Sequence, residues 1–426
     1  MARPSPRGTK PGGTGPSGGT GQGDSAGQGG GAGPSRGSGR SAIVAAVSAY
    51  SGRVLPELLA HGGATCPLAP WLLAALVAPA ATLERRARLE SVLGVPTNDA
   101  AALASELAGA GPRSLRAALA LWRCPDLATD GALGRWELGL PGATGRGPIP
   151  SQAEADDWTR LNTSGLIRRF PAAVGPSTLA VLAAAIAARA HWDRPLERAW
   201  PGPNAWNLEN MLSAEPVGVF DTAAGRLGVA RSVATGDGVS VYSFIGAPDV
   251  ARGTVASAAI AAIADWYAAD DPDTRIRDAA VALAGLEPRG HAWTVEPSTS
   301  ASAIVPAFVE KTDSADILAL PGIDDAAATL GELVREALPR PEPIRIGAVM
   351  SAVARYDRVG FEAAAVAAMI VAMAAFIQPQ PRLHLRFDRP HLAVAVATDE
   401  RFSGLPLFAA WVDAGACEPS ADRRPR

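Results

Sequence analysis

The sequence predicts an α+β fold, because segments with helical patterning come mainly first and segments with strand patterning come mainly at the end. The chain has 426 residues, of which 48% are hydrophobic and 19% are charged, and its net charge is -3. Such a composition is typical of a globular protein, and the length suffices for one large domain or two small ones.

The expected helices begin after a Gly-rich first segment. Residues 41–59 form an amphipathic helix that opens at Ser41, and residues 71–78 form a buried helix rich in Leu and Ala. The apolar stretch around the second helix has about 16 residues, fewer than the ~20 that a membrane span requires. A third helix stops at Gly94, which is a good C-terminal signal. This third helix and the remaining ones are expected at 85–93, 153–161, 255–268 and 324–338.

The expected strands lie mainly in the second half of the chain. Residues 229–233 and 239–244 are strand-like and are joined by the turn residues Thr-Gly-Asp-Gly. The apolar run 179–192 fits either a helix or a buried strand. The other expected strands are 115–122, 344–356, 383–387, 392–397 and 407–412.

Composition and spacing exclude several classes of function. The nearly neutral charge provides no electrostatic surface for nucleic acid or for acidic membranes. The histidines match no recognised metal or catalytic spacing, and His191 is expected on the surface of a strand. We therefore expect no cofactor, no metal and no enzymatic activity. The three cysteines are predicted to be small buried hydrophobes, and they are Cys66, Cys124 and Cys417.

The two ends of the chain differ from the rest. Residues 1–40 consist mainly of Gly, Ser, Pro and Thr, so they are expected to be disordered. They also lack the continuous apolar core of a signal peptide, which predicts a cytoplasmic protein. A single folded domain is expected over residues 41–418, followed by a disordered tail at 419–426.

One segment near the C-terminus is ambiguous. From Phe361 to Ile377 there is no Gly and no Pro, and only Glu362 is charged. A buried helix is one interpretation, because Ala and Met favour helices. An extended segment is the other, because alternate residues then form an entirely apolar face. That face consists of Phe361, Ala363, Ala365, Ala367, Met369 and Val371.

Several motifs resemble those of the serpin family, in the family's order. The small residues after Gly360-Phe361-Glu362 resemble the hinge of the serpin reactive loop. Cys66-Pro67-Leu68-Ala69 is similar to the family's Ser-Pro-x-Ser, and residues 158–167 resemble its Trp-…-Thr-Asn-Gly-x-Ile. Residues 192–196, 388–390 and 404–412 are similar to three further serpin motifs. The resemblance covers residues from about 41 to 413, and it makes 179–192 a strand.

The resemblance implies a divergent bacterial serpin with three β-sheets and about nine helices. It places an exposed reactive-centre loop above a large central sheet. It also implies a suicide substrate: a serine protease cleaves the loop, which then inserts into the central sheet and drags the attached protease with it. The chain would then be a monomeric inhibitor that acts on a target protease. A non-inhibitory binding protein with the same fold is the alternative.

The resemblance also assigns roles to individual residues. The sheet-opening region corresponds to Cys66, Ala69, Ala184 and Trp192. The hinge corresponds to Gly360, Phe361, Glu362, Ala363, Ala364, Ala365, Val366 and Ala367. The family's usual loop length places the reactive bond between Ala374 and Ala375. Small residues there suit an elastase-like or subtilisin-like serine protease.

The chain departs from the family at several of these positions. Phe361 stands where inhibitory members carry a small Thr or Ser, and forcing it between close-packed strands is expected to cost about 1–3 kcal/mol. Arg358 stands where an acid is usual, and His391 replaces a Phe. Cys66, Ala69 and Ala184 replace polar residues. These departures concern how efficiently the loop would insert more than they concern the fold.

Overall fold

The computed structural model describes most of the chain between Ser41 and Asp413. The described residues are 41–60, 63–196, 210–212, 217–268, 293–295, 300–340, 343–362, 382–387 and 389–413. The segments expected to be disordered, at the two ends of the chain, lie outside these residues, as does Cys417.

Four helices open the described chain: α1 (Ala42–Leu58), α2 (Leu68–Val77), α3 (Leu83–Leu93) and α4 (Thr97–Ala110). The first three were predicted. Helix α2 is buried along most of its length, as its Leu and Ala content requires, and Gly94 ends α3 with a left-handed φ of 76°. Helix α4 was not predicted, because Leu107 is the one large apolar residue on its buried face.

The central sheet is built from two groups of paired strands. The first group is β3 (Gly145–Pro148), β2 (Leu115–Arg123) and β4 (Ala180–Ala188), in that order. The second group is β5 (Ala190–His191), β14 (Gly360–Glu362), β13 (Val349–Tyr356) and β12 (Phe308–Asp316). Only Arg189 separates β4 from β5, so the two groups form one layer. The run 179–192 is therefore a strand, as the resemblance implied.

Six strands form a second sheet, which α1 and α7 (Arg252–Ala268) cover. The β8–β9 turn contains the predicted Thr-Gly-Asp-Gly sequence, and its Gly238 has a positive φ of 68°. A Cβ there would lie 2.7 Å from the Asp399 carboxylate, so glycine is required. In spatial order the strands are β1 (Ala64–Thr65), β17 (Pro406–Val412), β16 (His391–Ala397), β9 (Val239–Ile245), β8 (Gly225–Ala234) and β7 (Val217–Thr222).

A third sheet of four strands completes the β structure. Its order is β10 (Trp293–Val295), β15 (Arg382–Arg386), β11 (Ser300–Val305) and β6 (Asn210–Leu212). The strands predicted near the C-terminus are thus confirmed, although β13 begins at Val349 rather than at 344. Three sheets are what the resemblance implied.

The other helices are α5 (Ala132–Gly139), α6 (Gln152–Asn162) and α9 (Ile323–Ala337), which gives eight α-helices within the described residues. Helix α6 begins with a capping box, in which the backbone N–H of Glu154 donates to Ser151 Oγ and that of Ser151 donates to the Glu154 carboxylate. Among the described helices, none has the length and apolar character needed to cross a bilayer.

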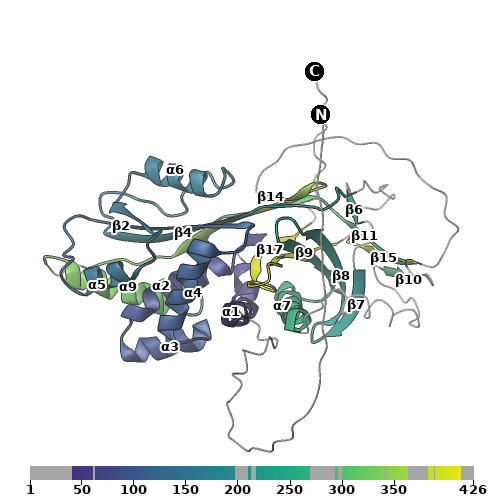
Figure 1. Cartoon of the computed structure of the whole chain (residues 1–426), viewed down its shortest axis with the longest axis horizontal. Coiled ribbons are helices and arrows are strands. Elements are labelled where there is room, and N and C mark those ends of the chain that lie inside the picture. The colour runs from purple at the N-terminus through teal and green to yellow at the C-terminus, as the bar shows by residue number, and fades with distance from the viewer. Residues whose placement is uncertain are drawn as a thin grey trace, which may run out of the picture. The chain divides into compact units, whose positions relative to one another are not determined.

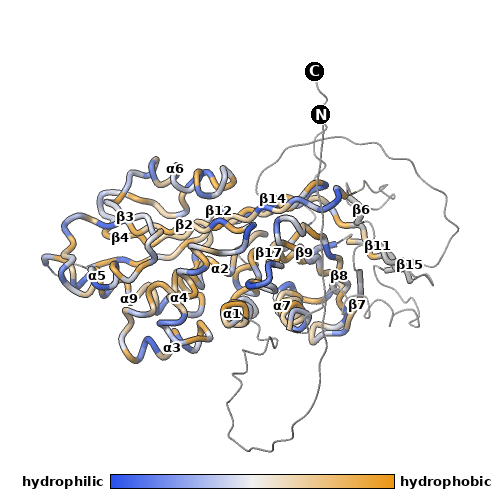
Figure 2. Tube along the Cα trace, in the orientation of Figure 1, coloured by the Kyte–Doolittle hydropathy of each residue, from blue (hydrophilic) through white to orange (hydrophobic). Residues whose placement is uncertain are grey.

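The helices lie on both faces of the central sheet. Figure 1 shows α6 on one face of β2 and β4, and α2, α4 and α9 on the other. The main core lies between the sheets and this second group of helices. Figure 2 shows hydrophobic and hydrophilic stretches alternating along α3, in line with a helix that buries only Leu89 and Leu93. The core is therefore concentrated behind the central sheet.

Candidate functional site

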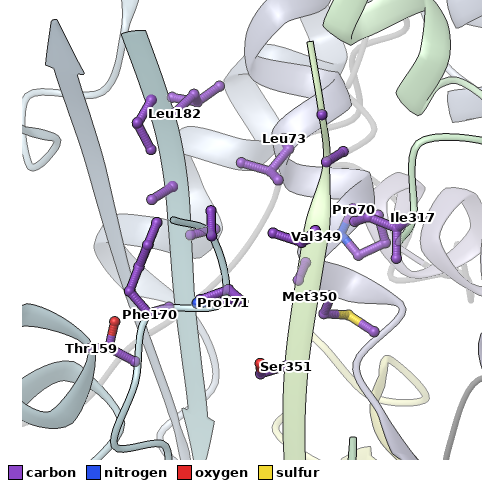
Figure 3. A pocket seen from close by; sticks show the side chains of 18 of the residues that line it. Pro70, Leu73, Thr159, Phe170, Pro171, Leu182, Ile317, Val349, Met350 and Ser351 are labelled. Atoms are coloured by element: carbon purple, nitrogen blue, oxygen red, sulfur yellow. The ribbon is translucent and has the colours of Figure 1, made fainter. Parts of the chain in front are cut away.

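A large cavity interrupts the central sheet between β4 and β13. These strands are not hydrogen-bonded to each other in the described structure, and the space between them has a volume of about 1070 Å³ (Figure 3). Leu182 projects from β4 on one side, Val349 and Met350 from β13 on the other, and Leu73 of α2 lies behind them. We call this space the interstrand cavity. Its size is at the upper end of the range for ligand clefts.

The lining of the interstrand cavity is mainly apolar, and the part that β4 contributes consists mostly of small residues. Strand β4 contributes Ala180–Ala188, in which six of the nine residues are alanine. Helices α2 and α9 and residues 343–348 close the inner side. Of the described residues that line the cavity, only Arg345 is charged. Along the cavity, β4 is paired only with β2, and residues 349–354 of β13 are paired only with β12, so the cavity has the form of a missing strand.

Strand β14 enters the sheet at one end of the interstrand cavity. It pairs antiparallel with β13 through Tyr356↔Phe361, and antiparallel with β5 through Gly360↔His191 and Phe361↔Ala190. The side chain of Phe361 is 4% exposed and belongs to the main core. The first three residues that the resemblance assigned to the hinge, Gly360–Glu362, therefore form a strand between β5 and β13.

The turn before β14 is fixed by hydrogen bonds to the side chain and the backbone of Asp357. Asp357 Oδ1 accepts hydrogen bonds from the backbone N–H groups of Val359 (2.9 Å) and Gly360 (3.1 Å), and Asp357 N–H donates to Gly360 O (3.0 Å). A Cβ on Gly360 would lie 2.3 Å from the carbonyl oxygen of Ala190. Only glycine fits there, because real Cβ atoms do not approach that closely. Sequence reasoning missed Asp357, although an Asp three residues before a Gly is a recognisable turn signal.

Trp192 supports the same turn from the neighbouring strand. Its indole N–H donates to Asp357 O (2.8 Å), and its ring lies 5.2 Å from the ring of Tyr356. The backbone adds bonds from Trp192 N–H to Val359 O (3.0 Å) and from Leu196 N–H to Arg358 O (2.8 Å). Trp192 was expected in the sheet-opening region, and the structure places it at the end of the cavity where β14 enters.

The other three residues that the resemblance assigned to the sheet-opening region line the interstrand cavity. Cys66, Ala69 and Ala184 come from distant parts of the chain, and all line it. The thiol of Cys66 donates to Leu407 O (3.2 Å), and burial raises its pKa to about 12, so it stays neutral. The expectation of a buried cysteine is confirmed for Cys66, whereas Cys124 is half-buried.

The structure shows which residues flank Phe361 in the sheet. It lies between β5 and β13, paired with the small Ala190 on one side and with Tyr356 on the other. The expected cost of about 1–3 kcal/mol for inserting Phe361 between close-packed strands stays a prediction.

The remaining predicted residues fall into two groups. His191 has an exposed side chain, as predicted, with Nδ1 3.0 Å from Asp237 Oδ2, whereas His391 is fully buried. The other hinge residues, 363–367, and the reactive bond at Ala374–Ala375 lie outside the described residues. Sequence reasoning also missed that α9 closes the cavity, since only packing brings Leu330 and Val334 to it.

Comparison with known proteins finds similarity in three-dimensional structure but none in sequence families. No protein-family model matches the sequence, and no curated protein matches it. Solved structures do match. Human glycosylated kallistatin is 14% identical, with a TM-score of 0.60 over 87% of this chain and 96% of that one. Human thyroxine-binding globulin with bound thyroxine is 14% identical, with a TM-score of 0.58 over 87% and 97%.

A third match is the thermophilic serpin tengpin in its native state, 13% identical, with a TM-score of 0.56 over 87% of this chain and 93% of tengpin. Nearly the whole length of each of these structures is covered, although few residues are identical. The arrangement of the three sheets and the helices is thus the shared feature. The protein has the serpin fold.

Proposed function

We propose that the protein is a serpin-type inhibitor of serine proteases that acts as a suicide substrate. The single observation that supports this proposal is the interstrand cavity with β14 paired at its end. A strand that continued from Glu362 would run directly into the cavity. Residues 363–371 carry no charge, which suits a lining in which Arg345 is the one charged residue described. The protein is then an inhibitor rather than an enzyme.

Continuing the observed pairing gives a specific register. Phe361 pairs with Ala190 and Tyr356, so residue 363 would lie between Ala188 and Ala354. By the same steps residue 367 would lie between Ala184 and Met350. Even-numbered residues of β4 and β13 face the main core, so residues 363, 365 and 367 would also face it. All three are alanines, which fit between strands with little displacement.

Filling the cavity would also satisfy the free strand edges. The inner edges of β4 and β13 present backbone N–H and C=O groups to the cavity. A strand formed by residues 363–371 could pair with both edges. Each ladder bond contributes about 0.5–1.5 kcal/mol net. Ordering each inserted residue costs about 1–2 kcal/mol, so the apolar contacts made by Val366, Met369 and Val371 would decide the balance.

The expected partner is an elastase-like or subtilisin-like serine protease, because the proposed reactive bond joins two alanines, Ala374 and Ala375. The test is incubation of the full chain with pancreatic elastase and with subtilisin, followed by denaturing electrophoresis. An SDS-resistant covalent complex is expected. Cleavage near 374–375 without any complex would contradict the proposal.

A matched pair of variants sharpens this test. Ala365→Asp places a charge on the face proposed to enter the core, so it should be cleaved normally but form no complex. Ala364→Glu is the control, because its side chain would point to the opposite face. The control should retain most of the complex formation. Equal trapping by both variants would show that insertion in this register does not occur.

A non-inhibitory binding protein with the same fold is the second candidate. Phe361 favours it, because a large residue already seated in the sheet differs from the small hinge residue of inhibitory members. One matching structure, thyroxine-binding globulin, is described as a complex with thyroxine. Melting temperature before and after limited proteolysis at 369–380 separates the two candidates. A large rise supports insertion, whereas an unchanged value supports the binding protein.

A further inference from the structure

Four strands contribute a continuous row of buried residues at the end of the interstrand cavity where β14 enters. Phe308 of β12 pairs with Tyr356 of β13, Tyr356 pairs with Phe361 of β14, and Phe361 pairs with Ala190 of β5. All four are at most 4% exposed. The rings of Phe308 and Tyr356 are stacked, with centroids 5.5 Å apart and planes at 5°. We call the three aromatic residues, Phe308, Tyr356 and Phe361, the aromatic row.

The aromatic row is held in place on both sides. Tyr356 Oη lies 2.6 Å from Ser232 Oγ, and the ring of Trp192 packs against Tyr356 from the end of β5. Phe361 completes the row in front of Ala190, whose methyl group leaves room for a large neighbour. Without Phe361 the row would end at Tyr356, and a void would face Ala190.

Phe361 is also the main source of apolar burial in β14. Gly360 has no side chain, and the turn that precedes it is fixed by hydrogen bonds to Asp357 and by bonds from Trp192 and Leu196. The backbone pairing of three residues is a short ladder on its own. The burial of one large aromatic side chain is therefore the main apolar contribution that keeps the segment between β5 and β13.

We propose that Phe361 is a positioning residue that seats Gly360–Glu362 in the central sheet of the intact chain, before any protease acts. The separation of β5 from β13 has then already occurred, and later insertion begins from a strand that is in register. The biological role that we assign to Phe361, preparing the loop for insertion, rests on the proposed function. The seating of the segment itself can be measured without a protease.

The experiment is hydrogen–deuterium exchange of the full, uncleaved chain, followed on peptides that cover 354–362 and 188–196. Both should be protected in the unaltered protein, since their amide groups bond across β5, β14 and the preceding turn. Phe361→Ser should raise the exchange rate of both peptides by about 100-fold or more. Phe361→Leu should restore most of the protection, because Leu retains the apolar volume. Val309→Ser is the control, since Val309 on β12 is 48% exposed and should leave both peptides unchanged.

A second variant keeps the test decisive if Phe361→Ser does not fold. Ala190→Leu fills the space opposite Phe361 from β5, so it should displace Phe361 and produce the same loss of protection at 354–362. Rapid exchange of 354–362 in the unaltered protein would overturn the inference, as would equal protection in Phe361→Ser. Failure to trap proteases would overturn the proposed function alone, because exchange is measured in their absence.

Discussion

The indole N–H of Trp192 donates a 2.8 Å hydrogen bond to the carbonyl oxygen of Asp357, which ties the end of β5 to the turn before β14. The bond spans 165 residues of sequence and joins the two strands between which β14 lies. Together with the contact between the Trp192 and Tyr356 rings, it holds β5 and β13 together beside β14.

Trp192→Phe is expected to lower the free energy of unfolding by about 1–3 kcal/mol. The variant keeps an aromatic ring beside Tyr356 but leaves a carbonyl oxygen without its donor. Chemical denaturation followed by far-ultraviolet circular dichroism measures the change. Trp158→Phe is the control, because Trp158 lies in a separate aromatic cluster with Trp122 and Phe170. An equal loss in both variants would mean that the hydrogen bond to Asp357 contributes nothing specific.

Gly360→Ala is expected to displace β14 from the sheet. Its Cβ would lie 2.3 Å from Ala190 O and 3.3 Å from the backbone of His191, so the two strands would have to separate. We expect a loss of about 1–3 kcal/mol in the free energy of unfolding, measured by urea titration. Gly347→Ala is the matched control, since nothing lies within 4 Å of a Cβ there. Unchanged stability of Gly360→Ala would contradict the observed strand pairing.

The sequence pattern predicted most elements whose apolar residues lie on one face. Helices α1, α3 and α6 were found close to their observed bounds. Strand β9, which is buried on both faces, was also found, whereas only residues 229–233 of β8 were predicted. Helix α4 and strand β12 were missed for a common reason: their buried faces include small or polar residues, such as Ala104 and Thr312, so neither shows a clear period. Residues 179–192 fitted either a helix or a strand because alanine occupies both faces of β4. The conformation of this segment is decided by packing against α2 on one face and α6 on the other.

The functional site was predictable only as separate residues. The resemblance grouped Cys66, Ala69 and Ala184, and the structure places all three around one cavity. The cavity itself could not be predicted, because it results from two strands about 165 residues apart that do not pair. The residues that flank Phe361 could not be predicted for a related reason. Its cost depends on the partner residue Ala190, which only the register of β14 and β5 identifies.

Ala184→Leu is expected to stabilise the intact chain while impeding insertion. Ala184 is half-buried and lines the interstrand cavity, so a larger side chain would fill part of it. Cavity-filling substitutions commonly add about 0.5–2 kcal/mol. The melting temperature of the uncleaved protein should therefore rise, and the further rise after loop cleavage should shrink. Ala102→Leu, on the exposed side of α4, is the control and should change neither value. An undiminished rise after cleavage would show that the inserted strand does not pass Ala184.

His391 gives the protein a predictable response to acid. Its ring is fully buried and packs 5.1 Å from the ring of Phe387, and Nδ1 lies 3.2 Å from Arg389 O. Within the described structure Nε2 has no hydrogen-bond partner. Burial lowers the pKa of His391 to about 4, and the charge of Arg389 acts in the same direction.

The unfolded chain, in which the pKa of His391 is near 6.5, binds more protons than the folded chain between about pH 4 and 6.5. Stability should therefore be complete above pH 6.5 and fall as the pH drops toward 4, by about 3 kcal/mol in total. His391→Phe should abolish this part of the pH dependence, because Phe carries no titrating group and fits the same apolar site. His191→Phe is the control, since the side chain of His191 is exposed and paired with Asp237. Urea titrations at pH 7.5, 6.0 and 5.0 measure the difference, and parallel pH profiles for His391→Phe and the unaltered protein would show that His391 is not the group responsible.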